Sequence, residues 1–371
     1  MLKNRATAED TLAYARRHAE LPANFRPMLG GLSVSSVGIG TYLGEPDEET
    51  DQAYAKAIKT ALLGGINLID TAVNYRFQRG ERTIGKVLDE LVGSGQLRRE
   101  EVVVATKGGY VTFDGTMPAN PRAWFEEKFV SSGLVRPGEL VEGSHCMTPR
   151  YLGAMLEMSR ANLGLDTIDI YYVHNPETQL AGVERPEFLE RMRRAFEFLE
   201  QQVARGKIGV YGTATWSGYR LGPGEQQYLQ MEELVKIAFE IAGRDHHFRA
   251  IQLPFNLAMP EALTVANQQL PDRRGTALRA AVGFGIAVCA SAALMQGRLA
   301  RGLPPIMSQA FEGLTTDAQR AVQFVRSAPG INVALVGMKS VSHVEEILEA
   351  LRHPPASIEA FSKLFTPNKN A

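Results

Sequence analysis

The sequence alternates short β-branched segments with amphipathic helical segments, and this alternation limits the possible folds more than any other feature. Runs such as 66–70 (INLID) and 102–106 (VVVAT) are expected strands, and the second has the uninterrupted apolar character of a strand in a parallel sheet. Segments 50–63 and 81–91 carry apolar residues at steps of three and four, which predicts helices. Eight strand-then-helix units follow one another, with strands expected at 36–41, 66–70, 102–106, 168–173, 208–211, 250–253, 286–290 and 333–336.

Eight such units favour an α/β fold of one kind, the closed (β/α)8 barrel or TIM barrel. The competing fold, an open doubly wound sheet, predicts a G-x-G-x-x-G turn after the first strand. Gly38, Gly40 and Gly44 have the wrong spacing for that turn, and no phosphate-binding G-x-x-x-x-G-K-[ST] motif is found. We therefore predict an N-terminal extension (1–30), one barrel domain (31–353) with a long insertion after the third strand (108–147), and a C-terminal tail (354–371).

Charge and apolar patterning exclude several classes of function. Lys and Arg number 40 against 41 Asp and Glu, so a chain-wide basic field for nucleic acid or anionic membrane is excluded. No apolar run has the length of a bilayer span or the character of a signal peptide. We expect a cytoplasmic protein with no nucleic-acid or membrane partner, and the oligomeric state stays open. Because His145 and Cys146 have no second Cys/His pair nearby, we expect no metal site.

Polar residues follow three neighbouring expected strands, at the ends where a barrel carries its active groups. Asp70 and Tyr75 follow the second strand, Lys107 the third and His174 the fourth. A lysine ammonium beside a tyrosine favours the phenolate, and we expect it to lower the pKa of a tyrosine general acid. A carboxylate would pair with that ammonium, and a neutral histidine could donate a hydrogen bond to a substrate oxygen.

With these residues in place, the chain resembles the aldo/keto reductase family. The segment 65–75 (GINLIDTAVNY) resembles the family's first signature, and 147–176 (MTPRYLGAMLEMSRANLGLDTIDIYYVHNP) resembles its second. The stretch from Gly285 (GIAVCASAALMQGRL) resembles the phosphate-binding segment after strand seven, and that from Ile331 (INVALVGMKSVSHVEEIL) resembles the adenosine-side segment. The resemblance runs from about Gly30 to Leu351.

The resemblance implies a tetrad of Asp70, Tyr75, Lys107 and His174. Tyr75 is then the general acid that protonates the carbonyl oxygen, with hydride supplied by a bound nicotinamide. It also implies a set of cofactor-binding positions, namely Thr41, Tyr42, Asp70, Thr215, Gln252, Leu294, Gln296, Gly297, Leu299, Lys339, Ser340 and Glu346. Lys339 matches a position that meets the 2′-phosphate, so NADP is expected and NAD is possible.

The chain departs from the family pattern at several cofactor positions. Ala214-Thr215 replace Ser-Asn, and Ser291 stands where an aromatic residue usually stacks on the nicotinamide. Trp216 is a candidate substitute for that aromatic residue, and no arginine directly follows Lys339 to share the phosphate.

We expect from these features an NADP-dependent oxidoreductase that reduces an aldehyde, ketone or sugar-like carbonyl. Two alternatives are an NAD(P)-dependent dehydrogenase acting on a sugar or alcohol, and a cofactor-sensing regulatory subunit like the potassium-channel β subunits that share the fold. The insertion at 108–147 contains five aromatic residues and leaves the third strand on the catalytic side. It is expected to fold as a lid over the substrate mouth, and the tail is a candidate to reach the same mouth.

Overall fold

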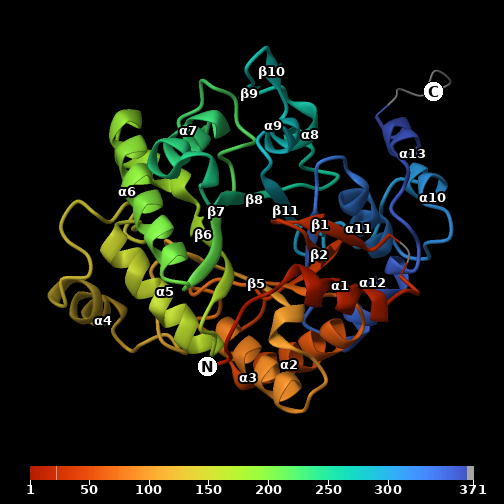
Figure 1. Ribbon diagram of the computed structural model, residues 1–371, viewed down its shortest axis with the longest axis horizontal. Helices are drawn as coiled ribbons and strands as arrows, with labels where there is room; N and C mark the ends of the chain where they lie inside the picture. The colour runs from red at the N-terminus through yellow and green to blue at the C-terminus, as the bar shows by residue number, and fades with distance from the viewer. Residues whose placement is uncertain (22, 366–371) are drawn as a thin grey trace.

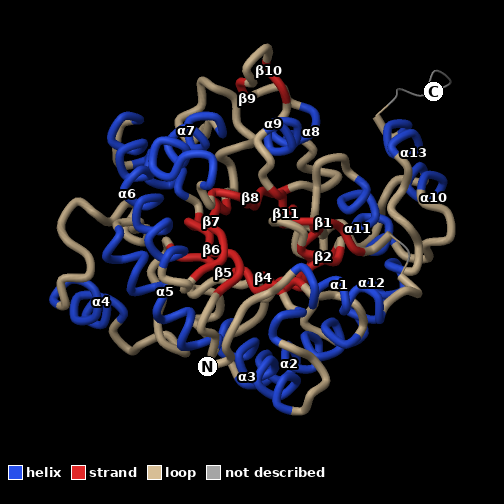
Figure 2. The backbone as a smooth tube through the Cα atoms, viewed as in Figure 1, coloured by secondary structure: helices blue, strands red, loops and turns tan. Residues whose placement is uncertain are grey.

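Eight parallel strands close into a barrel at the centre of the molecule, in the order β11-β12-β3-β4-β5-β6-β7-β8. The computed structural model describes residues 1–21 and 23–365. Figure 2 shows the strands as a central ring with helices outside it. The barrel strands are β3 (Val37–Gly40), β4 (Leu68–Asp70), β5 (Val103–Gly108), β6 (Ile168–His174), β7 (Ile208–Ala214), β8 (Phe248–Pro254), β11 (Ala287–Ser291) and β12 (Val333–Gly337). The predicted (β/α)8 barrel is thus confirmed.

Helices connect successive strands and cover the outside of the barrel, as the three- and four-residue periodicity predicts. Several begin at a side chain that accepts a hydrogen bond from a backbone N–H in the first turn, including Asp47, Thr148 and Thr316. The helices that follow the barrel strands are α2 (Glu48–Leu63), α3 (Arg79–Gly93), α5 (Pro149–Leu163), α6 (Arg185–Ala204), α7 (Met231–Ala242), α9 (Ala277–Gly283), α11 (Asp317–Ser327) and α12 (Val341–Leu351). Among the described residues, no helix has both the length and the apolar character needed to cross a membrane.

Strand register brings the polar strand-end residues to one level of the barrel. Asp70 pairs with Ala105 of β5, and Lys107 pairs with Tyr172 of β6. His174 pairs with Ala214 of β7, and Ala214 in turn pairs with Gln252 of β8. Since the strands are parallel, all of these positions lie toward the same end of the barrel.

The N-terminal segment covers the opposite end of the barrel. It contains the helix α1 (Ala8–Arg17) and a hairpin of β1 (Phe25–Met28) and β2 (Leu32–Ser35). The sequence pattern did not indicate the hairpin. Met28 and Val34 are buried against the apolar side chains of the barrel interior. The hairpin therefore closes this end of the barrel. It spans residue 30, where the sequence predicted that the N-terminal extension ends and the barrel domain begins.

The insertion after β5 packs beside the barrel. It forms α4 (Pro121–Phe125) and a π-helical segment (Glu126–Ser131), and in Figure 1 α4 lies at the outer edge beyond α5. Phe129, Val135 and Cys146 are buried against Tyr151 and Met155 of α5. These aromatic and apolar side chains are buried on α5, and the lid expected from the sequence stays a prediction.

The remaining helices are short and lie on the periphery. They are α8 (Glu261–Thr264), α10 (Ile306–Ala310) and α13 (Ile358–Lys363), and a small hairpin of β9 (Gln268–Gln269) and β10 (Arg274–Gly275) precedes α9. The described part of the C-terminal tail packs Phe361 against Phe324 of α11. Residues 366–371 of the expected tail lie outside the described residues.

Candidate active site

A cavity of about 890 Å³ opens at the carboxyl ends of the barrel strands. Its wall includes Asp70, Tyr75 and His174 at one side and Lys339 and His343 at another. A volume of this size lies within the range of small-molecule and cofactor sites. The cavity thus joins the strand-end residues to the start of the last barrel helix, α12.

Lys107 is the centre of a buried hydrogen-bond cluster beside this cavity. Its side chain is fully buried, and its ammonium nitrogen lies 2.8 Å from Asp70 Oδ2, 2.7 Å from the Thr71 carbonyl oxygen and 3.2 Å from Tyr75 Oη. These three contacts use all three N–H donors of the ammonium. The Lys107 ammonium is held by Asp70 and the Thr71 carbonyl, and its third hydrogen bond holds the Tyr75 phenol at the cavity wall.

The turn that carries Tyr75 has an unusual backbone. Arg76, Phe77 and Gln78 follow it with φ values of 48°, 53° and 74°, in the left-handed region that non-glycine residues seldom adopt. Arg76 is anchored there by an ion pair with Asp51 at 2.5 Å. The turn aims Tyr75 at the cavity immediately before α3 begins.

The charge states of Lys107 and Tyr75 follow from burial and from their mutual contacts. Burial opposes the charge of Lys107, yet the negative charge of Asp70 and the hydrogen bonds outweigh it and raise the lysine pKa. Burial raises the pKa of Tyr75 above its ordinary value, and the nearby Lys107 opposes that rise only partly. The expected lowering of the tyrosine pKa was therefore wrong for this state, because desolvation of the phenolate exceeds the attraction of the ammonium. Tyr75 keeps its proton, as an acid must.

His174 completes the group and is uncharged. Its ring lies 6.0 Å from the ring of Tyr75, measured between centroids, in an edge-to-face arrangement. Burial, followed by the charge of Lys107, holds the pKa of His174 well below its usual range. Its ring Nδ1 is buried and has no hydrogen-bond partner among the described residues. The structure thus brings together all four residues of the tetrad expected from the sequence.

Most of the expected cofactor positions line the cavity. Those that do are Tyr42, Asp70, Thr215, Gln252, Leu294, Gln296, Gly297, Lys339 and Glu346. The side-chain amide of Gln252 donates to Asp70 Oδ1 at 2.7 Å, and Glu346 accepts a hydrogen bond from Thr316 at 2.6 Å. Both side chains are therefore already bound within the protein.

Three expected cofactor positions lie outside the cavity lining. Thr41 is fully buried and donates to Thr71 Oγ1 at 2.9 Å, behind the wall. Ser340 caps α12 by accepting a hydrogen bond from the His343 N–H at 3.3 Å, and the Leu299 N–H donates to the Leu294 carbonyl at 3.1 Å. The cofactor contacts that the family resemblance implies for these three positions stay predictions.

The loop after β11 presents backbone donors to the cavity. Met295, Gln296 and Gly297 are left-handed in succession, with φ of 46°, 56° and 85°. Within the described chain, the N–H groups of Gln296 and Gly297 donate to no protein acceptor. A run of such N–H groups forms a concave anion site. The loop fits the pyrophosphate of a dinucleotide without a glycine-rich helix start.

Sequence reasoning missed two residues of this wall. Arg298 and His343 line the same cavity as Lys339. Arg298 lies in the segment after strand seven and His343 lies four residues after Lys339, and neither was expected to contact a cofactor. Residues from different loops can meet at one cavity wall, and no local sequence pattern indicates that they do.

The side of the cavity nearest Tyr75 was also incompletely predicted. Asn74, Tyr110, Asn175 and Trp216 line it, and of these only Trp216 was expected from the sequence to contact the cofactor. Trp216 is 48% exposed at the rim, and Tyr110 is the residue that the described insertion contributes to the wall. Asn74 is next to Tyr75 in the sequence and Asn175 is next to His174, and this adjacency could have indicated that both line the cavity.

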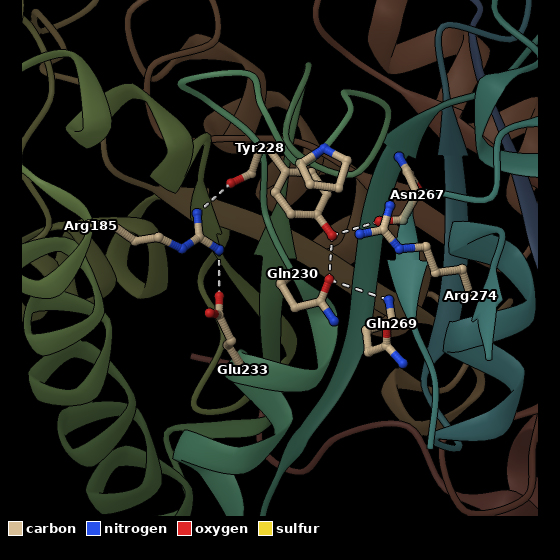
Figure 3. Close-up of a pocket in the computed structure, with 8 residues that line it drawn as sticks. Arg185, Tyr228, Gln230, Glu233, Asn267, Gln269 and Arg274 are labelled. Atoms are coloured by element: carbon tan, nitrogen blue, oxygen red, sulfur yellow. Dashed lines mark hydrogen bonds and ion pairs between the residues drawn. The ribbon is translucent and has the colours of Figure 1, made fainter. Parts of the chain in front are cut away.

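A second cavity of about 230 Å³ lies between the starts of α6 and α7 and the β9–β10 hairpin (Figure 3). Its polar groups largely bind one another. Arg185 pairs with Glu233, and Tyr228 Oη donates to the Asn267 carbonyl at 2.6 Å. None of the four tetrad residues lines it, so the larger cavity is the candidate active site.

Comparison with known proteins agrees with this geometry. A sequence model of the Aldo/keto reductase family matches residues 36–221, half of the chain, and the protein belongs to that family. The chain spans about half the length of the curated relatives it matches. It is 29% identical to the NADH-specific methylglyoxal reductase of Escherichia coli over 208 residues, 55% of this chain and 54% of that protein. It is 25% identical to the 6-dehydroglucose reductase of Novosphingobium aromaticivorans over 201 residues, 53% of each chain.

Solved structures share the fold over nearly the whole chain. An aldo/keto reductase from Klebsiella pneumoniae, crystallised with NADP and acetate, superposes with a TM-score of 0.61 at 20% identity, covering 94% of this chain and 97% of that one. The holo form of an aldo-keto reductase from Bacillus halodurans gives a TM-score of 0.63 at 18% identity, covering 92% and 96%. At these identities the likeness establishes the barrel fold.

Proposed function

We propose that this protein is an NAD(P)H-dependent reductase of small carbonyl compounds, with Tyr75 as the general acid. The observation that carries the proposal is the hydrogen bond of 3.2 Å from a buried, doubly anchored Lys107 to the Tyr75 hydroxyl at the wall of the large cavity. Family membership and the named reductases among the relatives support it.

The residues around the cavity fit a dinucleotide. The free N–H groups of Gln296 and Gly297 suit a pyrophosphate, and Arg298 and Lys339 supply positive charge for a further phosphate, beside the imidazole of His343. We infer that NADP is the preferred cofactor and that NAD is a weaker one. When bound, the nicotinamide supplies the hydride.

Each tetrad residue then has a defined task. Tyr75 holds a proton within reach of the cavity and gives it to the oxygen that becomes an alkoxide as hydride arrives at carbon. Lys107 remains charged and stabilises the phenolate left behind, while Asp70 fixes the lysine. Uncharged His174 donates a hydrogen bond that orients the carbonyl oxygen, a role its depressed pKa allows across neutral pH.

The test is reduction of a panel of aldehydes and ketones, including methylglyoxal and oxidised sugars, followed by loss of NADPH absorbance. We expect turnover in the wild type and a loss of about 10²- to 10⁴-fold in kcat for Tyr75→Phe, with NADPH binding retained. Tyr228→Phe, which removes a phenol hydroxyl beside the smaller cavity, is the matched control and should keep its kcat. Unchanged turnover in Tyr75→Phe would refute the assignment of the acid.

A further inference from the structure

His145, a residue of the insertion, is fully buried and makes hydrogen bonds through both ring nitrogens. Its Nε2 lies 2.6 Å from the carbonyl oxygen of His174, and its Nδ1 lies 2.8 Å from the side-chain nitrogen of Gln179. An amide nitrogen can only donate, so Nδ1 must accept and the proton must be on Nε2. The ring therefore donates to the backbone of the tetrad histidine in a single tautomer.

Gln179 is itself fixed from two further sides. Its amide nitrogen also donates to the His145 carbonyl at 3.1 Å, and its amide oxygen accepts a hydrogen bond from Arg191 of α6 at 2.5 Å. A chain of contacts thus runs from α6 through Gln179 and His145 to the peptide of His174. Every donor and acceptor of the Gln179 amide and the His145 ring has a partner in this chain.

Two neighbouring residues of the insertion shape the same contact. A Cβ atom on Gly109 would lie 2.7 Å from the His174 carbonyl oxygen and 2.9 Å from His145 Nε2, so only glycine leaves room for this hydrogen bond. The ring of Tyr110 stands edge-to-face with both histidines, at 5.1 Å from His174 and 5.0 Å from His145. Its hydroxyl accepts a hydrogen bond from Asn175 at 3.2 Å.

We propose that His145 is a positioning residue that, together with Gly109 and Tyr110, clamps His174 in the orientation needed to bind the carbonyl oxygen. The inference rests on the proposed function, because it gives His174 that role. It assigns the insertion a task at the active site although its bulk packs on α5. A displacement of His174 of about 1 Å is enough to lower turnover by about 100-fold.

The experiment compares two substitutions in the full-length protein. His145→Gln places an amide donor near the position of Nε2 and should retain kcat within about threefold, since the hydrogen bond to the His174 carbonyl is preserved. His145→Leu removes the donor and should lower kcat by about 10- to 100-fold, with NADPH binding and the KM for NADPH unchanged. Phe129→Leu is the matched control, since it loosens the same insertion without touching His145 or His174.

Histidine side-chain NMR gives a readout independent of turnover. In the wild type, His145 should show a protected Nε2–H and an unprotonated Nδ1, and in His145→Leu the ring signals of His174 should shift while those in Phe129→Leu stay in place. The proposal is overturned if His145 carries its proton on Nδ1, if the His174 signals do not respond, or if His145→Leu keeps the kcat of Phe129→Leu. If Tyr75→Phe retains full activity, the proposed function fails, and the NMR comparison still decides the clamp.

Discussion

Replacing Lys107 with methionine tests the electrostatic design of the site, because this ammonium is fully buried and bonded to Asp70 at 2.8 Å. The substitution leaves the Asp70 carboxylate, itself only 6% exposed, with the Gln252 amide as its remaining side-chain donor among the described residues. Removing one partner of a buried ion pair typically costs about 3–5 kcal/mol. We expect Lys107→Met to lose about that much stability and at least about 100-fold in kcat.

The double substitution Lys107→Met/Asp70→Asn separates the two effects. It leaves no uncompensated buried charge, so it should regain at least about 2 kcal/mol relative to Lys107→Met while its kcat stays low. Stability is measured by urea unfolding followed through Trp fluorescence, and kcat by NADPH oxidation. Lys59→Met, at an ion pair with Glu90 that is exposed to solvent, is the matched control and should cost under about 1 kcal/mol. A double variant no more stable than Lys107→Met would refute the electrostatic reasoning.

Three further predictions concern the cofactor, pH and the far end of the barrel. Replacing Arg298 or Lys339 with glutamine should weaken NADPH binding by about 10- to 100-fold and NADH binding far less. Fluorescence titration measures both affinities, and an equal loss of affinity for NADPH and NADH would exclude a contact with the 2′-phosphate. Burial holds the pKa of His145 at about 4, so the unfolded chain binds an extra proton below pH 6.5. The wild type should therefore lose on the order of 3 kcal/mol of stability between pH 6.5 and 4 from this group, and acid unfolding of His145→Gln should be correspondingly shallower. Asp169→Ala removes the carboxylate that accepts hydrogen bonds from the Ala6 and Val104 N–H groups and pairs with Arg99. It should lower the free energy of unfolding by about 3–5 kcal/mol and leave kcat unchanged, because Asp169 lies at the end of the barrel opposite the active site. A lower kcat in the folded variant would contradict this separation of the two barrel ends.

Much of the site could be predicted because parallel strands end at a common level. Asp70, Lys107 and His174 each follow a recognisable apolar run, so their convergence required only the strand count and the parallel order. The sign of the Tyr75 pKa shift could not be predicted, since it depends on how strongly the phenol is desolvated relative to its distance from Lys107. The sequence did not indicate that Arg298 and Tyr110 line the cavity, because their neighbours there are remote in the chain.

The packing of the insertion could also be predicted only in part from the sequence. Its aromatic content indicated that it would pack, but not on which surface. Apolar side chains of α5 provided that surface, and the contact of His145 with His174 arises only once both segments are folded.

Local periodicity and residue type, carried by the sequence alone, determined the eight strand–helix units, the barrel and the tetrad, because hydrophobic spacing fixes which face of each element is buried. The tertiary structure alone decided where the insertion and the N-terminal hairpin pack, which loops share the cavity wall, and the protonation of the buried groups. Those outcomes depend on contacts between residues far apart in the chain and on the desolvation that such contacts produce.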